Sequence, residues 1–376
     1  MKILSVFGTR PEAIKMCPLV KRIMQEKDMD SIVCVTGQHK EMLYQVLDIF
    51  QIEADYDLKI MTPNQTLGMI TSKILNGMDE VLLKEKPDLV LVHGDTTTSF
   101  SVALSAFYHQ IPVGHVEAGL RTYDKYSPFP EEMNRNLTGK IATLHFAPTI
   151  GNLENLKKEN ITEGVYVTGN TVIDAMKMIV TDHYAFKNQI LCNLDFKSGK
   201  RYILMTAHRR ENFGIPLENI CHAVKRIAEE YADIVVIYPV HMNPKVRDTV
   251  NSILADQERV VLINPIDVEE MHNLMNLCYL VLTDSGGLQE EAPALGKPVL
   301  VMRTETERPE AAEAGTVEIL GIEEENIYAG IRSLLDDKEK YRKMSKAVNP
   351  YGDGKACERI VQILRQYGKI QEGSTS

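Results

Sequence analysis

The chain has 376 residues, of which 44% are hydrophobic and 25% charged, a composition typical of a soluble globular protein large enough for two domains. Its formal net charge of −10 argues against nucleic acid or an anionic membrane as its general partner. Six cysteines are scattered without a CxxC pair, which favours reduced thiols in a cytoplasmic protein over a disulfide framework or a zinc site. No apolar run approaches the ~20 residues that cross a bilayer, and the N-terminus is expected to be a first strand rather than a signal peptide.

The first half of the chain alternates short apolar runs with helical stretches, which is the pattern of a parallel sheet with crossover helices. The expected strands of this half are Ile3–Phe7, Ser31–Thr36, Asp88–Val92, Pro112–Glu117, Thr143–Phe146 and Val165–Val167. A helix is expected after Pro11, another up to about Phe50, a long one over Thr66–Lys84, and one that opens at Glu131.

The same rhythm restarts in the second half, after a helix expected over Thr171–Phe186. The expected strands there are Tyr202–Met205, Ile234–Tyr238, Val260–Ile263, Leu280–Thr283, Pro298–Met302 and Val317–Leu320. The sequence therefore predicts an α/β protein with two Rossmann-like, doubly wound domains, residues 1–169 and 170–354, facing each other across a deep cleft. A C-terminal helix within residues 355–376 is expected to return to the first domain.

The stretch Val281–Leu300 reads as a buried strand, a glycine turn and a short helix. Gly286 and Gly287 lack Cβ atoms, so a ligand can come close to the backbone there. The free N–H groups of the first helical turn favour phosphate, and Ser285 can add a hydroxyl donor. Glu290 and Glu291, one turn further on, are suited to accept hydrogen bonds from sugar hydroxyls. An ordinary βα turn uses the same residue types, so a purely structural role remains an alternative.

Polar side chains also follow the ends of the other expected strands, where ligands of open parallel sheets bind. These residues are Arg10, Gln38, His39, Asp95, Glu117, His208, Arg209, Arg210 and His241. Carboxylates and bases would thus collect on the walls of one cleft, which predicts a binding or catalytic site.

Several of these residues have structural alternatives. Asp95 could cap a helix, and Glu131 with Glu132 could do no more than favour a helix dipole. Glu117 at the end of an apolar strand needs a partner, a raised pKa or a catalytic role, and Arg121 or His115 could be the structural partner.

Two basic residues of the second half, His208 and Arg308, also have structural alternatives. His208 could be a satisfied core histidine, although Arg209 and Arg210 beside it favour an anion site. Arg308 could form an ordinary surface ion pair. The chain has no GxGxxG or HExxH pattern and no paired Cys/His spacing, so we expect neither a dinucleotide cofactor nor a metal.

Taken together, eight motifs resemble the non-hydrolysing bacterial UDP-N-acetylglucosamine 2-epimerases, in register over nearly the whole chain. The motifs are Phe7–Ala13, His93–Thr98, Gly114–Arg121, Pro130–Glu132, Ala207–Asn212, Thr283–Pro293, Glu307–Glu310 and Asn349–Gly354. The resemblance implies a GT-B fold, a homodimer, and interconversion of UDP-N-acetylglucosamine (UDP-GlcNAc) with UDP-N-acetylmannosamine (UDP-ManNAc) for surface polysaccharide synthesis.

The resemblance also implies roles for individual residues. UDP-sugar contacts would come from Arg10, Lys15, Asp95, Glu117, His208, Ser285, Gly286, Gly287, Glu291 and Arg308. Acid–base catalysis would come from Asp95, Glu117 and Glu131, with His208 near the leaving phosphate. A second, activating UDP-GlcNAc would contact Gln38, Glu131, Arg209 and His241. Asn64 and Glu41 depart from the arginine and glutamine expected at that second site.

The expected reaction is elimination of UDP to a 2-acetamidoglucal followed by re-addition, because the proton on carbon 2 is not α to a carbonyl. A GT-B glycosyltransferase, a hydrolysing epimerase and a non-catalytic UDP-sugar sensor are the competing hypotheses.

Overall fold

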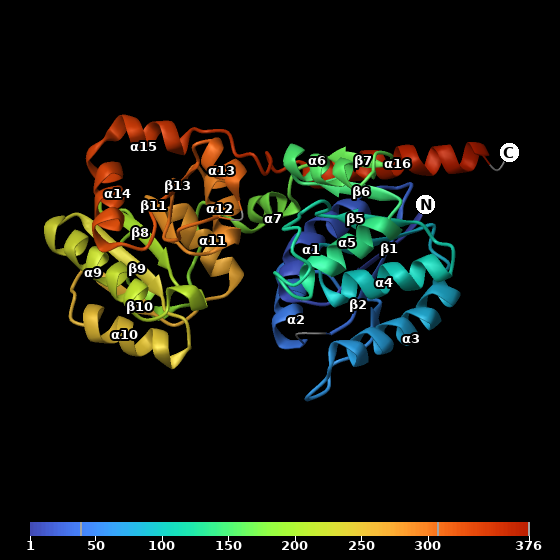
Figure 1. Ribbon diagram of the computed structural model, residues 1–376, viewed down its shortest axis with the longest axis horizontal. Coiled ribbons are helices and arrows are strands. Elements are labelled where there is room, and N and C mark those ends of the chain that lie inside the picture. Colours follow the sequence, from blue (N-terminus) through green and yellow to red (C-terminus); the bar gives the residue numbers. More distant parts are fainter. Residues whose placement is uncertain (38–39, 307, 375–376) are drawn as a thin grey trace. The chain divides into compact units, whose positions relative to one another are not determined.

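The computed structural model describes residues 1–37, 40–306 and 308–374 and contains two compact units (Figure 1). One is Met1–Met178 together with Tyr351–Ser376, and the other is Ile179–Pro350. The division lies after Met178, whereas the sequence suggested a position near residue 170. Helix α7 (Thr171–Ile179) packs with the first unit because the Asp174 carboxylate accepts hydrogen bonds from the Ala356 and Cys357 backbone N–H groups, at 3.1 and 3.0 Å. These groups open the C-terminal helix α16 (Ala356–Ser374), which contacts α1.

The first unit contains a seven-stranded parallel sheet in the order β3-β2-β1-β4-β5-β6-β7. Its strands are β1 (Lys2–Phe7), β2 (Asp30–Val35), β3 (Tyr56–Asp57), β4 (Leu89–His93), β5 (Val113–Val116), β6 (Leu144–Ala147) and β7 (Val165–Val167). Its other helices are α1 (Arg10–Met24), α2 (Lys40–Ile49), α3 (Leu67–Glu85), α4 (Thr97–Tyr108), α5 (Glu131–Ile141) and α6 (Ile150–Lys158). The strand order reverses between β1 and β4, which is where doubly wound sheets bind ligands.

The second unit contains a six-stranded parallel sheet in the order β10-β9-β8-β11-β12-β13, which reverses between β8 and β11. Its strands are β8 (Arg201–Thr206), β9 (Ile234–Pro239), β10 (Val260–Ile263), β11 (Leu280–Thr283), β12 (Val299–Val301) and β13 (Val317–Ile319). Its helices are α8 (Gln189–Cys192), η1 (Arg210–Asn212), α9 (Ile215–Glu230), α10 (Pro244–Leu254), α11 (Val268–Leu277), α12 (Gly286–Glu291), η2 (Ala292–Leu295), α13 (Pro309–Glu313), α14 (Glu324–Asp336) and α15 (Lys338–Ser345). The expectation of two doubly wound parallel sheets is confirmed.

The helix expected over Thr171–Phe186 ends earlier, at Ile179. Asn273 of α11 accounts for this, because its side chain donates to the Ile179 carbonyl (3.2 Å) and accepts from the Thr181 N–H (2.9 Å). Those bonds replace intrahelical ones just where the chain passes from one unit to the other.

Local capping fixes the turn between β1 and α1. Thr9 caps α1, and the Glu12 carboxylate accepts hydrogen bonds from the Gly8 and Thr9 backbone N–H groups, at 3.0 and 2.7 Å. The second oxygen of Glu12 accepts from the Thr96 hydroxyl (2.6 Å), the N-cap of α4. A Cβ on Gly8 would lie 2.0 Å from Thr36 Oγ1, so only glycine fits there. The turns after β1 and β4 are therefore tied together.

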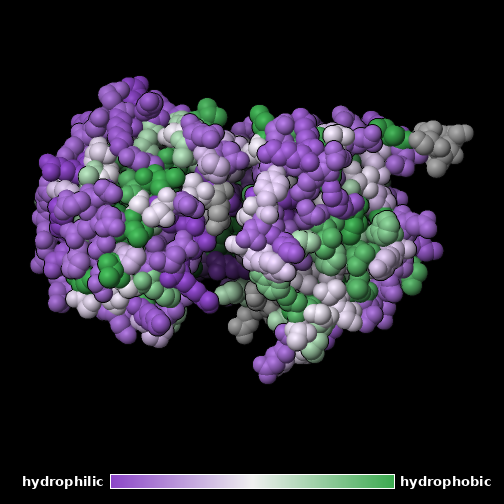
Figure 2. Space-filling model, in the orientation of Figure 1, coloured by the Kyte–Doolittle hydropathy of each residue, from purple (hydrophilic) through white to green (hydrophobic). Residues whose placement is uncertain are grey.

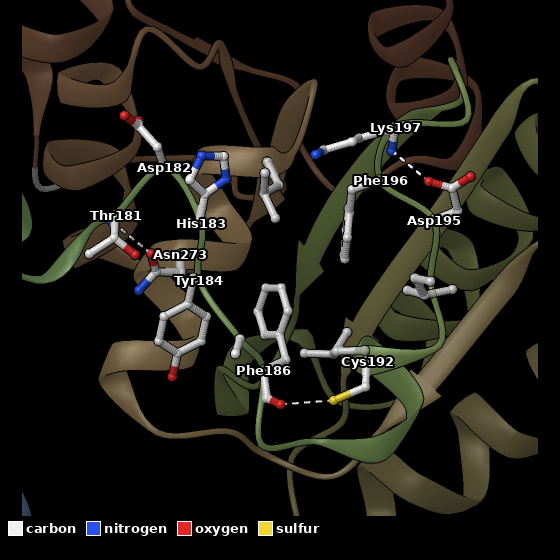
Figure 3. A pocket seen from close by; sticks show the side chains of 14 residues that line it. Thr181, Asp182, His183, Tyr184, Phe186, Cys192, Asp195, Phe196, Lys197 and Asn273 are labelled. Atoms are coloured by element: carbon white, nitrogen blue, oxygen red, sulfur yellow. Dashed lines mark hydrogen bonds between the residues drawn. The ribbon is translucent and has the colours of Figure 1, made fainter.

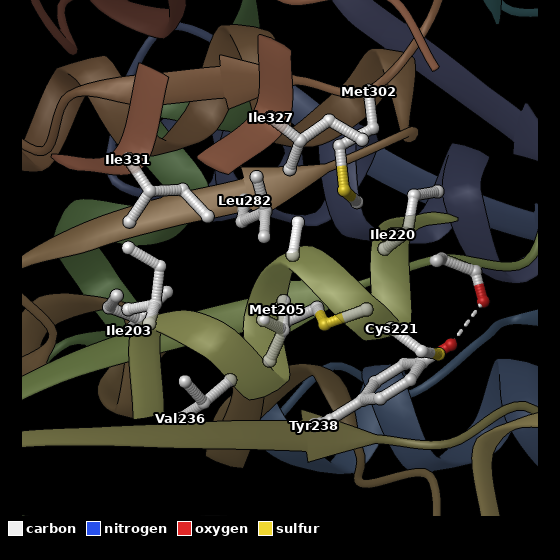
Figure 4. Packing of buried hydrophobic residues seen from close by; sticks show 14 of the residues in the cluster. Ile203, Met205, Ile220, Cys221, Val236, Tyr238, Leu282, Met302, Ile327 and Ile331 are labelled. Atoms are coloured by element: carbon white, nitrogen blue, oxygen red, sulfur yellow. Dashed lines mark hydrogen bonds between the residues drawn. The ribbon is translucent and has the colours of Figure 1, made fainter. Parts of the chain in front are cut away.

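The core of the second unit positions its own turns. Ile203, Met205, Val236, Tyr238 and Leu282 belong to one buried cluster of side chains from the sheet and the helices that cover it (Figure 4). Burying each large apolar side chain contributes roughly 1.5–3 kcal/mol to folding. The buried Tyr238 hydroxyl donates to the Ala207 carbonyl (2.7 Å), so the core holds the backbone at the end of β8.

The face drawn in Figure 2 is mainly hydrophilic, with hydrophobic residues gathered around α4, where Phe107 is 59% exposed. Within the described part of the chain, no helix is both long and apolar enough to cross a membrane.

Candidate active site

The first unit places a lysine, a histidine and a glutamate together at the carboxyl ends of β4 and β5. Lys15 Nζ donates to both carboxylate oxygens of Glu117, at 2.7 and 2.6 Å. His93 Nε2, almost fully buried, lies 2.7 Å from Glu117 Oε2 at ion-pair distance, although its ring N–H is not aligned for a hydrogen bond. Burial opposes ionisation of Glu117, but Lys15 and His93 outweigh it and hold its pKa well below the ordinary value. Glu117 is therefore a carboxylate at neutral pH.

The backbone of Glu117 is strained. Its φ of +62° lies in the left-handed region, which non-glycine residues rarely adopt and which costs on the order of 1–3 kcal/mol. The proposed structural partners are wrong, because Arg121 pairs with Glu159 (2.7 Å) and His115 contacts the Gly94 carbonyl (2.7 Å). Backbone strain at Glu117 and the close approach of Lys15 and His93 to its carboxylate favour a functional role.

Asp95 lies in the turn after β4, close to Glu117. Its carboxylate is 3.0 Å from Arg135 Nη2, and its carbonyl accepts from the Asn134 side chain (2.9 Å). Burial raises the pKa of Asp95, the Arg135 guanidinium opposes that shift, and the negative charge of Glu117 adds to it. The alternative role of Asp95 as a helix cap is wrong, since Thr96 caps α4. Two neighbouring carboxylates thus have opposite pKa shifts.

The two glutamates that open α5 have different surroundings. Glu132 is buried, and its carboxylate accepts hydrogen bonds from the Thr122 and Tyr123 backbone N–H groups (3.0 and 2.9 Å), so it holds the preceding loop. Glu131 is half-buried, and its carbonyl accepts from Arg135 Nε (3.4 Å). Because Arg135 also pairs with Asp95, the start of α5 is tied to the turn after β4. Arg10, half-buried, is the first residue of α1.

In the second unit the turn after β11 presents Ser285 as the N-cap residue of α12, with Gly286 and Gly287 as its first residues. The Ser285 side chain makes no capping hydrogen bond. Glu291, at the end of α12, lies 3.1 Å from Nε2 of the buried His272 of α11.

Glu290 and Arg308 form a buried ion pair in the same region. One carboxylate oxygen of Glu290 thus pairs with Arg308, while the expectation that Glu290 accepts from a sugar hydroxyl stays a prediction. The alternative that Arg308 forms a surface ion pair is wrong, because both side chains are largely buried.

His208 follows β8 and is exposed, so it is not a core histidine. Its ring stacks on that of His241, with centroids 5.9 Å apart and planes inclined by 19°. The Arg209 backbone N–H donates to Asp284 (2.8 Å). The structure thus groups His208, Arg209 and His241, three of the residues expected around the ligands. Gln38, expected at the second UDP-GlcNAc site, lies outside the described residues.

Four residues that contact the expected site were not identified from the sequence: His93, Arg135, His272 and Asp284. His93 and Asp284 lie inside motifs that carry the resemblance, which was a usable signal. Arg135 and His272 lie in helices without any distinguishing pattern, so only their contacts reveal them.

The second unit also has a cavity of about 530 Å³ (Figure 3). Its lining includes Tyr184, Phe186, Cys192 and Phe196, together with Asn273 and Leu277 of α11. None of the expected site residues lines it. In the described ranges, no three His, Cys, Asp or Glu side chains are grouped so that they could hold a metal ion.

Comparison with known proteins identifies the family of the chain. The family model described as UDP-N-acetylglucosamine 2-epimerase matches residues 21–365. The UDP-N-acetylglucosamine 2-epimerases of Bacillus subtilis and Escherichia coli K12 are 54% and 53% identical to this chain, over 99% and 97% of it and 97% and 98% of theirs. A solved structure of UDP-GlcNAc 2-epimerase from Neisseria meningitidis bound to UDP-GlcNAc is 48% identical, with a TM-score of 0.86 over 97% of this chain and 100% of that one. The expected GT-B fold class is confirmed, and the chain belongs to the UDP-N-acetylglucosamine 2-epimerase family.

Proposed function

We propose that this chain interconverts UDP-GlcNAc and UDP-ManNAc by eliminating UDP and adding it back. The observation that supports this most is that two neighbouring carboxylates lie in opposite electrostatic settings. Glu117 lies beside Lys15 and His93, and the partly buried Asp95 lies beside Arg135. An enzyme that inverts one carbon needs a base on one face and an acid on the other, and two carboxyls with separated pKa values supply them.

Elimination overcomes the weak acidity of the proton on carbon 2. As the bond between carbon 1 and the UDP oxygen breaks, positive charge develops at carbon 1 and acidifies carbon 2. A carboxylate then takes the proton, the electron pair of the C–H bond forms the C1=C2 double bond, and the C–O bonding pair leaves with UDP. The products of this step are 2-acetamidoglucal and UDP. Re-protonation of carbon 2 from the opposite face and return of UDP to carbon 1 give the epimer.

We assign the base in one direction to Glu117, because its low pKa keeps it ionised. Asp95 is the donor to the opposite face, because its raised pKa favours the protonated form. In the reverse direction the two exchange roles, as microscopic reversibility requires. Glu131, at the helix start tied to Asp95 through Arg135, would stabilise the positive charge near carbon 1.

We assign the UDP part of the substrate to the second unit. Gly286 and Gly287 leave space for the diphosphate, and Ser285 has a hydroxyl that makes no capping hydrogen bond. Arg308 and His208 supply positive charge for the leaving group. Glu291 is suited to accept from the ribose hydroxyls. Arg10 and Lys15 of the first unit complete the proposed set.

The competing functions are separated by one incubation. The chain is mixed with UDP-GlcNAc alone and the solution is followed by NMR. Our proposal predicts UDP-ManNAc without any acceptor. A glycosyltransferase or a sugar sensor would leave UDP-GlcNAc unchanged, and a hydrolysing epimerase would accumulate free N-acetylmannosamine and UDP.

Four further properties belong to the same proposal: a homodimer, a cytoplasmic location, supply of UDP-ManNAc to surface polysaccharide synthesis, and activation by a second UDP-GlcNAc. For the second site, the stacking of His241 on His208 and the position of Arg209 support a ligand next to the catalytic one. Activation by a second UDP-GlcNAc is tested by measuring the initial rate against UDP-GlcNAc concentration. A sigmoidal rather than hyperbolic dependence is expected.

A further inference from the structure

Asp284, the last residue before the Ser285–Gly287 turn, is a fully buried carboxylate. Its Oδ2 accepts hydrogen bonds from the backbone N–H groups of His208 and Arg209, both at 2.8 Å, and from the Asn212 side chain at 3.1 Å. Since Asp284 follows β11 and His208 follows β8, this one carboxylate joins the two strand ends at which the sheet order reverses.

The other oxygen of Asp284 faces the His208 ring. Oδ1 lies 3.3 Å from His208 Nδ1, which is ion-pair distance, but the two are not aligned for a hydrogen bond. Oδ1 is therefore a buried carboxylate oxygen without a hydrogen bond among the described residues. An arrangement of this kind costs free energy unless the oxygen gains a donor in another state of the protein.

The backbone around His208 is fixed from two further sides. The buried Tyr238 hydroxyl donates to the carbonyl of Ala207, the residue before His208. Asn212 donates to the Met302 carbonyl (3.2 Å) as well as to Asp284. The turn is thus rigid while the His208 side chain remains 42% exposed, so ring rotation is the free adjustment that can complete the bond to Asp284.

We propose that Asp284 is a positioning residue that accepts the Nδ1 proton of His208, so that a protonated imidazole directs its Nε2–H at the departing diphosphate. This inference rests on the proposed epimerase function, in which His208 stabilises UDP as leaving group. A carboxylate on one ring nitrogen fixes the tautomer and stabilises the imidazolium, the same relationship that aspartate and histidine have in serine protease triads. No bond to Asp284 itself changes in the reaction.

The charged groups around His208 are consistent with this role of Asp284. Partial burial lowers the pKa of His208, the Asp284 carboxylate opposes that shift, and His241 and Arg209 add to the lowering. Among the described residues, these three are the charged or titratable groups that act on the ring. Asp284 is therefore the group that favours the imidazolium before the anionic substrate arrives.

The test is a double-mutant cycle with Asp284→Asn and His208→Gln. Asn keeps the shape of the side chain and an oxygen for the backbone N–H groups, but it places no negative charge beside Nδ1. We expect Asp284→Asn alone to lower kcat about a hundredfold with KM changed less than threefold. In the His208→Gln background, Asp284→Asn should change kcat less than threefold, because the imidazole through which Asp284 acts is already absent. Multiplicative effects of the two substitutions on kcat would overturn the proposal.

The pH dependence of kcat distinguishes a positioning role of Asp284 from a purely structural one. Without the Asp284 charge, His208 loses its proton at lower pH, so the alkaline limb of kcat should shift down by about one pH unit. An unshifted limb would contradict the proposal. The matched control is Asp174→Asn, another buried carboxylate that accepts two backbone N–H groups, which should lower thermal stability but leave kcat and the limb unchanged.

A second measurement covers the case in which Asp284→Asn does not fold. In ¹⁵N-histidine-labelled wild type saturated with UDP at neutral pH, both His208 ring nitrogens should be protonated, assigned by their loss in His208→Gln. A bare Nδ1 in that complex would overturn the proposal. Failure of the wild type to bind UDP or to epimerise UDP-GlcNAc would instead sink the underlying function, so the two failures are distinguishable.

Discussion

Lys15 Nζ donates to both carboxylate oxygens of Glu117, at 2.7 and 2.6 Å, and joins the first helix of the chain to a strand end about a hundred residues later. The side chains are only 20% and 12% exposed, so water screens the pair weakly. Lys15 is therefore expected to set the ionisation of the proposed base rather than merely to contact substrate.

Replacing Lys15 with Met should raise the pKa of Glu117, because the nearest cation is lost. The acid limb of kcat should move to higher pH by at least about one unit, with kcat at neutral pH reduced ~10²-fold or more. The matched control is Lys2→Met, which breaks a lysine–glutamate pair with Glu85 (3.5 Å) in the same unit. Equal profiles for Lys15→Met and wild type would show that Glu117 does not act as the base.

Substitution should distinguish the three proposed catalytic carboxylates from Glu132, to which we assign a structural role. Asp95→Asn, Glu117→Gln and Glu131→Gln should each lower kcat by ~10²–10⁴ while UDP affinity stays within a few-fold. Glu132→Gln should instead lower the unfolding midpoint, because Glu132 accepts the Thr122 and Tyr123 N–H groups, with kcat reduced less than tenfold. Steady-state kinetics and calorimetry of UDP binding measure both. Near-normal activity in all three active-site variants would refute the site assignment.

His272 should act through Glu291 on the nucleoside rather than on the phosphates. Its Nε2 lies 3.1 Å from Glu291 Oε2, so His272→Leu removes that contact from the carboxylate. We expect UDP to bind roughly tenfold more weakly and pyrophosphate, which lacks the ribose, to bind as before. His272→Gln, which can still donate, should recover most of the UDP affinity. A parallel loss of pyrophosphate binding would mean that His272 only supports the local fold.

The strands and the strand ends that carry the site were predictable, because apolar runs, glycine turns and capping residues are local features of the sequence. Asp95 and Glu117 were identified by their position after buried strands, but their partners were not. The partners Lys15, His93 and Arg135 come from other elements, and contacts between elements far apart in the chain have no local pattern. The early end of α7 was missed for the same reason, since Asn273 of α11 determines it.

Two buried histidines should make the first unit sensitive to mild acid. Burial lowers the pKa of His115 to about 3 and that of His145 to about 4, from the ordinary 6.5. Below pH 6.5 the unfolded chain takes up protons at these positions and the folded chain does not, so stability falls as pH decreases toward 4. Each histidine contributes up to ~1.4 kcal/mol per pH unit.

Hydrogen exchange of the β5 and β6 amides between pH 6.5 and 5 measures that loss, after correction for the intrinsic pH dependence of exchange. His145→Gln should reduce the slope by about half, because Gln does not titrate. A slope equal to that of the wild type would show that His145 is not the source of the acid sensitivity.

Deuterium incorporation tests the elimination pathway itself. Turnover of UDP-GlcNAc in D₂O should place deuterium at carbon 2 of the UDP-ManNAc formed, because the proton taken by one carboxyl is replaced from a different, solvent-exchanged one. Mass spectrometry and ¹H NMR of the product report the label. Product that carries only the original hydrogen at carbon 2 would contradict a mechanism with two carboxyls on opposite faces.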